Sequence, residues 1–184
     1  IFQKKRVLRI RISAEMLCSL AIFYFIAVIS SSFTEPANTI MGYIEAVCIS
    51  TEKGVVKEAV PEIVLRAGWG IEGDAHAGEW HRQVSMLAGE SIDRMREKMH
   101  ELDHGVFAEN IVTRGIDLVS LVPGERLQAG ESVLLEVTQI GKECHNDGCA
   151  IQRATGDCIM PREGVFCRVL QGGTLQAGMM VAVL

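Results

Sequence analysis

Short apolar runs separated by glycine make up most of the chain after residue 40. In the run Tyr43–Ser50, apolar side chains fall on both faces of an extended chain, which is typical of a mostly buried β-strand. Glycine turns such as Val122–Glu125 and Gln171–Thr174 punctuate the later runs. We predict strands for these runs, which are Val84–Leu87, Asn110–Thr113, Arg126–Ala129, Val133–Gln139, Phe166–Leu170 and Val181–Leu184.

One segment, from Ser91 to about Leu102, has the spacing of an amphipathic helix. Its apolar residues recur at intervals of three and four, with charged residues between them, and Gly105 follows as a stop. These apolar residues are Ile92, Met95, Met99 and Leu102. A shorter helix is predicted over Ala150–Ala154. Many short strands with little helix predict a β-dominated α+β fold, either a β-barrel or a strongly bent sheet, with one clear helix and short additional helices.

The composition changes abruptly at Met41. Residues 1–40 hold five basic and two acidic side chains, whereas residues 41–184 hold 13 basic and 21 acidic ones. The second segment has no linker or repeat that would divide it, so we expect residues 41–184 to form one domain and residues 1–40 to lie outside it. The net charge of −5 for the whole chain gives no electrostatic reason to expect binding to nucleic acid.

Residues 16–33 form an uncharged, largely apolar segment that follows a basic run. This layout is typical of a signal peptide or an amino-terminal anchor, and its length approaches the roughly 20 residues of a membrane-spanning helix. The alternative is that translation starts at Met41 and that residues 1–40 are an upstream extension, which the change in composition favours. In that case we expect a cytoplasmic protein without membrane contact. If residues 1–40 are genuine, we expect a membrane-anchored or exported one.

The six cysteines are irregularly spaced, and the chain exceeds the size at which secreted folds depend on disulfides, so we expect reduced thiols. Cys48 and Cys167 lie in predicted strands and are interpreted as packing residues. Cys144 differs, because Lys142 and His145 flank it in a polar, glycine-containing loop, and such neighbours lower the pKa of a thiol. It is the best candidate for a nucleophile or a soft-metal ligand, with an inert buried thiol as the alternative.

A zinc site is a second interpretation of this region, since four nitrogen and sulfur ligands are present. The ligands would be Cys144, His145, Cys149 and Cys158. Their separations fit the usual paired spacing of structural zinc sites only loosely.

Two further clusters carry polar groups in glycine-containing loops. In the segment Gly68–Gly78, Asp74 and His76 are two residues apart, so an extended chain places both side chains on one side. The alternative is a surface turn closed by an Asx-type hydrogen bond from Asp74. Arg82 adds positive charge shortly afterwards. Arg162 follows Pro161 before a turn and is interpreted either as an oxyanion ligand or as a solvated surface arginine.

Six ordered motifs resemble the MOSC domain, the family named for the carboxy-terminal domain of molybdenum cofactor sulfurase. They are Gly73–Gly78, Arg82–Ser85, Phe107–Ile111, Leu121–Gly124, Val137–Gln139 leading to Cys144, and Arg162–Phe166. The resemblance extends from about Tyr43 to Leu184 and implies a β-rich, barrel-like fold. It also implies a role for the chain in handling the molybdenum cofactor (molybdopterin) or sulfur.

The resemblance matches the single family cysteine to Cys144, which is then a persulfide acceptor or a molybdenum thiolate ligand. The pterin carries a phosphate or nucleotide, so an anion-binding loop is required. The cofactor-binding residues expected from the matched motifs are Gly73, Asp74, His76, Gly78, Arg82, Asn110 and Arg162. The expected partners are a sulfur donor such as a cysteine desulfurase, or a molybdoenzyme acceptor. We expect no pyridoxal-phosphate domain in this chain.

Two features depart from the family pattern. Glu143 stands where many relatives have proline, and its carboxylate opposes ionisation of the neighbouring thiol. Cys149 and Cys158 are additional thiols that could resolve a persulfide. Three functions therefore stay open at this point. They are a cofactor-binding or sulfur-carrying module, a molybdenum-dependent reductase of N-hydroxylated compounds, and a zinc-bound interaction domain.

Overall fold

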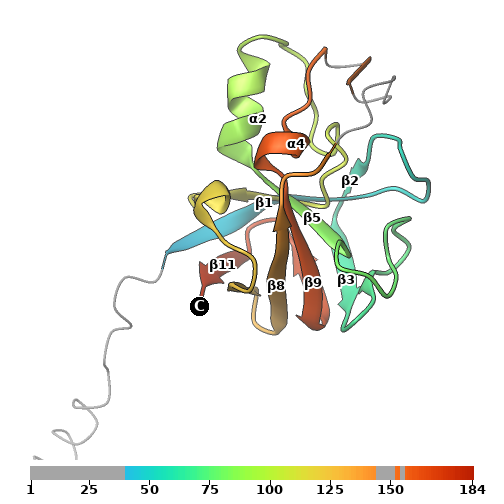
Figure 1. Ribbon diagram of the computed structural model, residues 1–184, viewed down its shortest axis with the longest axis vertical. Helices are drawn as coiled ribbons and strands as arrows, with labels where there is room; N and C mark the ends of the chain where they lie inside the picture. Colours follow the sequence, from blue (N-terminus) through green and yellow to red (C-terminus); the bar gives the residue numbers. More distant parts are fainter. Residues whose placement is uncertain (1–39, 144–151, 154–155) are drawn as a thin grey trace, which may run out of the picture. The chain divides into compact units, whose positions relative to one another are not determined.

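Seven strands close into a barrel within the described part of the chain (Figure 1). In order around the barrel they are β11 (Met180–Val183), β7 (Arg126–Ala129), β8 (Val133–Ile140), β9 (Val165–Gln171), β5 (Val84–Ala88), β6 (Ile111–Arg114) and β1 (Met41–Ile49). Pairing of β1 with β11 completes the ring, and all neighbours are antiparallel except β5 and β6. The structure is a computed structural model that describes residues 40–143, 152–153 and 156–184.

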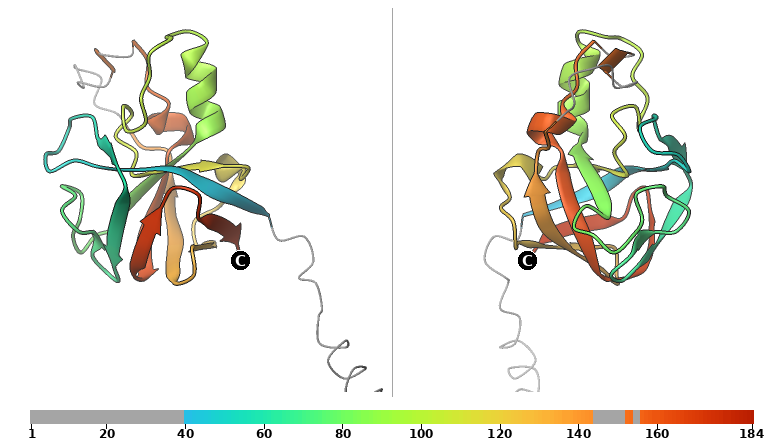
Figure 2. Two further views of the ribbon diagram at one scale, coloured as in Figure 1. Left: turned by 180° about the vertical axis from the view of Figure 1, so that it is seen from behind. Right: turned by 45° about the vertical axis from the view of Figure 1, so that its right-hand side comes forward.

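Smaller elements surround the barrel. A short strand, β2 (Glu58–Val60), pairs with the carboxy-terminal end of β1. A separate three-stranded sheet is formed by β10 (Gly173–Gln176), β3 (Glu62–Arg66) and β4 (Gly70–Ile71). The described helices are α2 (Gly89–Arg96), α4 (Met160–Glu163) and the 3₁₀ turn Leu118–Ser120. Both views in Figure 2 place α2 and α4 together at one end of the barrel.

Alternation along the strands produces two apolar clusters. On β8, Val133, Leu135 and Val137 point inward and are buried, while the residues between them are half-buried. They belong to the cluster that fills the barrel. The second cluster lies outside the barrel wall, where Ile92 and Met95 of α2 pack with buried residues of β1, β5, β6 and β9. Helix α2 therefore packs on the outward-facing residues of these strands, at the end of the barrel where α4 also lies.

The predicted β-dominated fold is confirmed, and every predicted strand is present to within a few residues. Strands β2, β3, β4 and β10 were not predicted. Strand β3 does alternate between exposed and buried residues, but it follows Pro61 in a charged stretch that reads as a loop. Strand β4 has only two residues, Gly70 and Ile71, which is too short for a periodicity to show.

The predicted helix bounds, Ser91 to about Leu102, are wrong at both ends. Helix α2 begins at Gly89, where packing leaves no room for a side chain, because a Cβ there would lie 2.1 Å from Glu45 Oε2. It ends at Arg96, whose Nε and Nη2 both donate to the carbonyl oxygen of Leu102, at 2.9 and 2.8 Å. These two hydrogen bonds hold the chain after the helix close to Arg96. Leu102 therefore joins the apolar cluster from a loop and not from a continued helix.

Two other sequence-based expectations fall largely outside the described residues. These are the short helix over Ala150–Ala154 and the separation of residues 1–40 from the domain, which both stay predictions. Among the residues that the structure describes, no helix is long and apolar enough to cross a membrane.

Candidate functional site

A cavity of about 170 Å³ lies between β5, helix α4 and the glycine-containing loop that follows β4. Its apolar lining consists of Trp80, Ala108, Met160 and Phe166. Its polar lining consists of His76, Arg82, Ser85, Asn110 and Lys142. Every charged or titratable side chain in this described lining is basic, so the cavity favours an anion.

Arg82 is held in the cavity wall by two aromatic rings. Its guanidinium carbon lies 5.1 Å from the centre of the Trp80 ring and 5.7 Å from the centre of the Phe166 ring. The Nε atom is buried and has no hydrogen-bond partner among the described residues. Buried donors are nearly always paired in folded proteins, so this nitrogen is open to an acceptor from outside the described residues.

Asp74, which was predicted to face the ligand, has a side chain that is fully buried beneath the loop. Its Oδ2 accepts hydrogen bonds from the Lys57 ammonium, from Asn110 Nδ2 at 2.9 Å and from the Ser50 backbone N–H at 3.2 Å. Its Oδ1 accepts the His76 backbone N–H at 2.9 Å, which is the Asx-type hydrogen bond considered above. Burial acts to raise the pKa of Asp74, but the hydrogen bonds from His76 and Lys57 outweigh it and hold that pKa well below its ordinary value.

His76 connects this buried carboxylate to the cavity. Its Nδ1 lies 3.4 Å from both Asp74 Oδ1 and Lys57 Nζ, on the buried side of the ring. The other edge of the imidazole, which carries Nε2, is therefore turned away from the buried pair, and the side chain is 30% exposed. Trp80 stacks against the ring with centroids 6.5 Å apart, and its Nε1 donates to the His76 carbonyl oxygen at 2.7 Å.

Asn110 joins the cavity to β1 and β5. Its Oδ1 accepts the Ser85 backbone N–H at 3.1 Å, and its Nδ2 donates to the Cys48 carbonyl at 3.0 Å and to Asp74. The side chain thus satisfies three neighbouring segments at once, which fixes the floor of the cavity. Asn110 was predicted only through the family resemblance, and Ser85 was not predicted as a cavity residue.

The glycine-containing loop is shaped by close contacts and by Gln83. Gln83 Nε2 donates to the carbonyl oxygens of Gly68 and Gly78, at 2.6 and 2.9 Å, and ties both sides of the loop together. Gly73 has a φ of +77°, which only glycine adopts without strain. These features give the loop its course past the cavity. The direct ligand contacts predicted for Gly73 and Gly78 stay predictions.

Glu109 is a buried acidic residue beside the cavity that the sequence did not single out. Its carboxylate accepts the backbone N–H groups of Gly105 and Phe107, at 2.6 and 3.0 Å, and so fixes the turn before β6. The next residue back, Ala108, lines the cavity with a strained φ of +65°. Burial raises the pKa of Glu109 to about 7, although the backbone hydrogen bonds oppose this.

A pH dependence of stability follows from Glu109. Between about pH 6 and about pH 8, Glu109 is already ionised in the unfolded chain. In the folded chain, its carboxyl group loses its proton over this same range, so the unfolded state binds fewer protons than the folded state. Stability should therefore fall as the pH rises. We expect the free energy of unfolding of the wild type to drop by about 1 kcal/mol more than that of Glu109→Gln over this interval. Urea denaturation at both pH values measures the difference, and parallel pH profiles for the two proteins would show that Glu109 titrates elsewhere.

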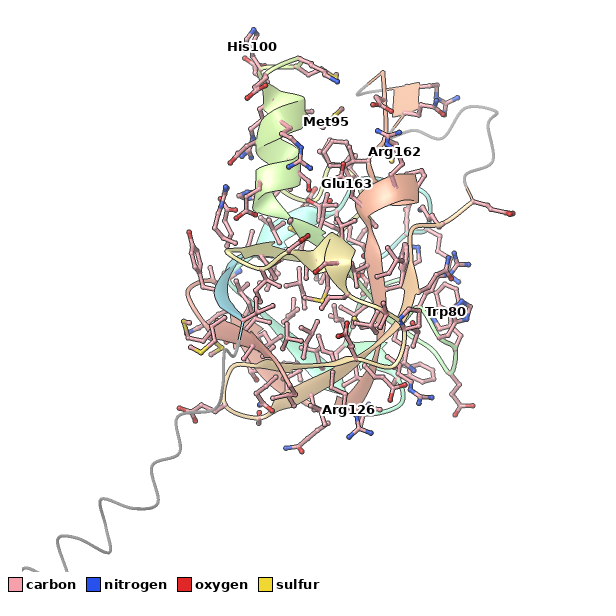
Figure 3. The ribbon with its side chains drawn as sticks, turned by 60° about the vertical axis from the view of Figure 1, so that its left-hand side comes forward. Trp80, Met95, His100, Arg126, Arg162 and Glu163 are labelled. Carbon is pink, nitrogen blue, oxygen red and sulfur yellow. The ribbon has the colours of Figure 1, made fainter. Side chains whose placement is uncertain are left out.

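Arg162, Cys48 and Cys167 are not among the residues that line the cavity. Arg162 lies on α4, is 57% exposed, pairs with Asp157 at 3.1 Å and is not part of the cavity lining, so its contact with a ligand stays a prediction (Figure 3). Cys48 and Cys167 are fully buried, as predicted for packing residues, and burial raises the pKa of each thiol to about 12.

Of the other predicted zinc ligands and thiols, the structure describes only Cys158. Cys158 is buried, whereas Cys144, His145 and Cys149 lie outside the described residues. The roles predicted for the latter three, including the zinc interpretation, therefore stay predictions. Among the residues that are described, no group of three or more His, Cys, Asp or Glu side chains could hold a metal ion.

Sequence reasoning missed Lys57, which stands behind Asp74 and His76, and Trp80, which stacks on His76. It noted Lys142 only as a neighbour of Cys144. Lys57 lies in a charged stretch after β1 that resembles any exposed loop, so nothing in its local sequence marks it as buried. For Trp80, a signal was present, since a tryptophan in a polar glycine-rich loop is uncommon unless it packs or binds.

A family model described as MOSC domain matches residues 73–182 of the chain. No curated protein matches the sequence.

Several solved structures share the fold. The crystal structure of the YuaD protein from Bacillus subtilis matches with a TM-score of 0.66 and 22% identity, covering 79% of this chain and 97% of that one. YiiM from Escherichia coli matches with a TM-score of 0.56 and 18% identity, covering 81% and 70%. YiiM from Geobacillus stearothermophilus matches with a TM-score of 0.54 and 18% identity, covering 79% and 74%. At these identities the likeness is one of fold.

Proposed function

The chain is a member of the MOSC domain family, as its ordered motifs predicted, and from this membership we propose that it binds the molybdenum cofactor. The phosphate-bearing end of the cofactor lies in the cavity beside His76, Arg82 and Lys142. The protein then serves as a cofactor-binding or sulfur-carrying module, with Cys144 as its reactive thiol. The observation that carries the proposal is the buried Nε of Arg82, a donor without a described partner in a wall whose charged side chains are all basic.

The donor set of the cavity suits a phosphate. Arg82 and Lys142 offer charged N–H groups, and charge-assisted hydrogen bonds to phosphate oxygens are the strong ones in proteins. Asp74 does not repel such a ligand, because Lys57 neutralises its carboxylate beneath the loop. A cavity of about 170 Å³ is smaller than the roughly 300 Å³ at which whole-ligand pockets begin, so it holds one end of the cofactor.

The protein's own groups have distinct tasks in this proposal. Arg82, Lys142 and His76 bind and orient the anionic end, while the aromatic and methionine side chains of the lining exclude water from it. When bound, the cofactor supplies molybdenum held by its dithiolene sulfurs. Cys144 follows Lys142 by two positions in the sequence, which supports assigning the thiol to the same site.

Sulfur transfer to Cys144 needs no external oxidant or reductant. The thiolate attacks the terminal sulfur of a donor protein's persulfide, so an S–S bond forms at Cys144 while the donor's S–S bond breaks and the donor leaves as a thiolate. A cysteine desulfurase is the proposed donor and a molybdoenzyme the proposed acceptor.

The anion site can be tested by following the Nε–H signal of Arg82 in a ¹H–¹⁵N spectrum while inorganic phosphate is added. We expect a saturable shift at Arg82, because phosphate supplies the acceptor that this buried donor lacks. Arg126 is the control, since its side chain is 56% exposed and does not line the cavity. A spectrum in which Arg82 does not respond, or in which both arginines shift alike, contradicts the proposal.

A further inference from the structure

A buried lysine lies directly behind His76. Lys57 belongs to the segment between β1 and β2, and its side chain is only 1% exposed. Its backbone N–H donates to the Gly105 carbonyl at 2.8 Å, and this contact helps to hold it in place. Burying an ammonium group is unfavourable unless it is paired, so the partners of Lys57 determine what it does.

The ammonium has two polar side-chain partners in the described part of the chain. It forms an ion pair with Asp74 Oδ2, and it lies 3.4 Å from His76 Nδ1. Asp74 Oδ2 also accepts N–H groups from Asn110 and Ser50, so it is already crowded with donors. A second N–H of Lys57 therefore has Nδ1 as its available acceptor among these groups, and leaving that N–H unpaired would be costly.

Asp74 Oδ1 competes for the same ring nitrogen, because it also lies 3.4 Å from Nδ1. This oxygen, however, already accepts the His76 backbone N–H at 2.9 Å. Asp74 Oδ1 already has one hydrogen bond, so the absence of a second one costs little free energy. A buried Lys57 ammonium with an unpaired N–H costs more. The need to pair this N–H therefore favours an unprotonated Nδ1 that accepts a hydrogen bond from Lys57.

The charges around Lys57 support an ion pair near neutral pH. Burial lowers the pKa of Lys57, and its hydrogen bond to Asp74 opposes this effect. Cys48 and Glu109 are the other titratable groups that act on the ammonium: the Cys48 thiol is neutral near pH 7, and only the ionised form of Glu109 adds a weaker stabilisation. Asp74 accepts N–H groups from Ser50, Asn110 and the His76 backbone, and these bonds favour its ionised form, so the carboxylate remains the counter-ion of Lys57.

We infer that Lys57 is a positioning residue that donates to His76 Nδ1 and so holds the imidazole in the tautomer with its proton on Nε2. The ring then presents a hydrogen-bond donor to the cavity. The ligand atom beside His76 must accordingly be an acceptor, such as a phosphate oxygen, and a donor group is disfavoured at this point. The inference rests on the proposed function only in taking this cavity as the place where the ligand's anionic end binds.

The tautomer can be measured directly in the full chain with ¹⁵N-labelled histidine, using two-bond ¹H–¹⁵N correlations. In the wild type we expect a protonated Nε2 and an unprotonated Nδ1 at His76. In Lys57→Met the proton should move to Nδ1, where Asp74 Oδ1 accepts it, and Lys57→Arg should restore the wild-type pattern. His81 is the internal control, because it bonds Gln139 and should not respond. A wild type with its proton on Nδ1, or a Lys57→Met spectrum equal to the wild type, overturns the inference.

Phosphate affinity gives a second readout. Lys57→Met should weaken binding of inorganic phosphate about tenfold, the value of one good hydrogen bond, and Lys57→Arg should recover most of that loss. Equal losses in both variants overturn the positioning role. If Lys57→Met does not fold, the wild-type tautomer alone decides. A wild type with the expected tautomer that binds no phosphate refutes the proposed function while leaving the role of Lys57 intact.

Discussion

Replacing Arg82 with glutamine is expected to weaken cofactor binding about 10- to 100-fold. The wild-type Nε is a buried, unpartnered donor in a basic wall, and a charge-assisted hydrogen bond contributes about 1.5–3 kcal/mol. Glutamine keeps part of the side-chain volume between Trp80 and Phe166 but loses the charge and the Nε–H. The loss is measured as the dissociation constant for molybdopterin, and as the pterin retained per chain after purification.

Two matched variants separate this effect from general damage. Arg126→Gln removes a guanidinium from β7, at the end of the barrel away from α2, and should bind the cofactor like the wild type (Figure 3). Arg82→Lys keeps a charge but not the planar group between the two rings, so an intermediate affinity is expected. Equal affinities for Arg82→Gln and Arg126→Gln would remove Arg82 from the binding site.

Replacing Cys144 with serine is expected to abolish persulfide formation on the protein. The hydroxyl of serine is not ionised near neutral pH and cannot accept a sulfane sulfur, whereas a thiolate can. Incubation with a persulfide donor, followed by mass spectrometry of the intact chain, should show a gain of one sulfur in the wild type and none in Cys144→Ser.

Cys149→Ser is the control for this experiment, because it removes a neighbouring thiol and leaves Cys144 in place. It should still gain one sulfur. Phosphate binding at Arg82 should persist in Cys144→Ser, since the cavity lining does not change. A persulfide that forms equally on Cys144→Ser would show that another cysteine is the acceptor.

Much of the barrel could be predicted from the sequence, because apolar and polar residues alternate along its strands. Strand β8 is an example, since its buried residues follow the pleat at every second position. The end of helix α2 could not be predicted, because it depends on the Arg96 side chain reaching the Leu102 carbonyl. Such a bond between a side chain and a later loop leaves no trace in the spacing of apolar residues.

The candidate site divides in the same way. His76 and Arg82 were identified because glycines and polar groups cluster around them, and both line the cavity. Asp74 was also identified, but it lies beneath the loop and bonds Lys57. The burial of Lys57 and Glu109 depends on packing between β1, β2 and the turn before β6, so it becomes visible only when distant segments are brought together.

Whether this chain binds the molybdenum cofactor is decided by the amount of molybdenum and pterin that the wild-type protein carries when it is purified, without added metal, from cells that make the cofactor. We expect close to one molybdenum and one pterin per chain, with both strongly reduced in Arg82→Gln and retained in Arg126→Gln. Stoichiometric zinc without pterin, or equal pterin in the two arginine variants, would contradict it.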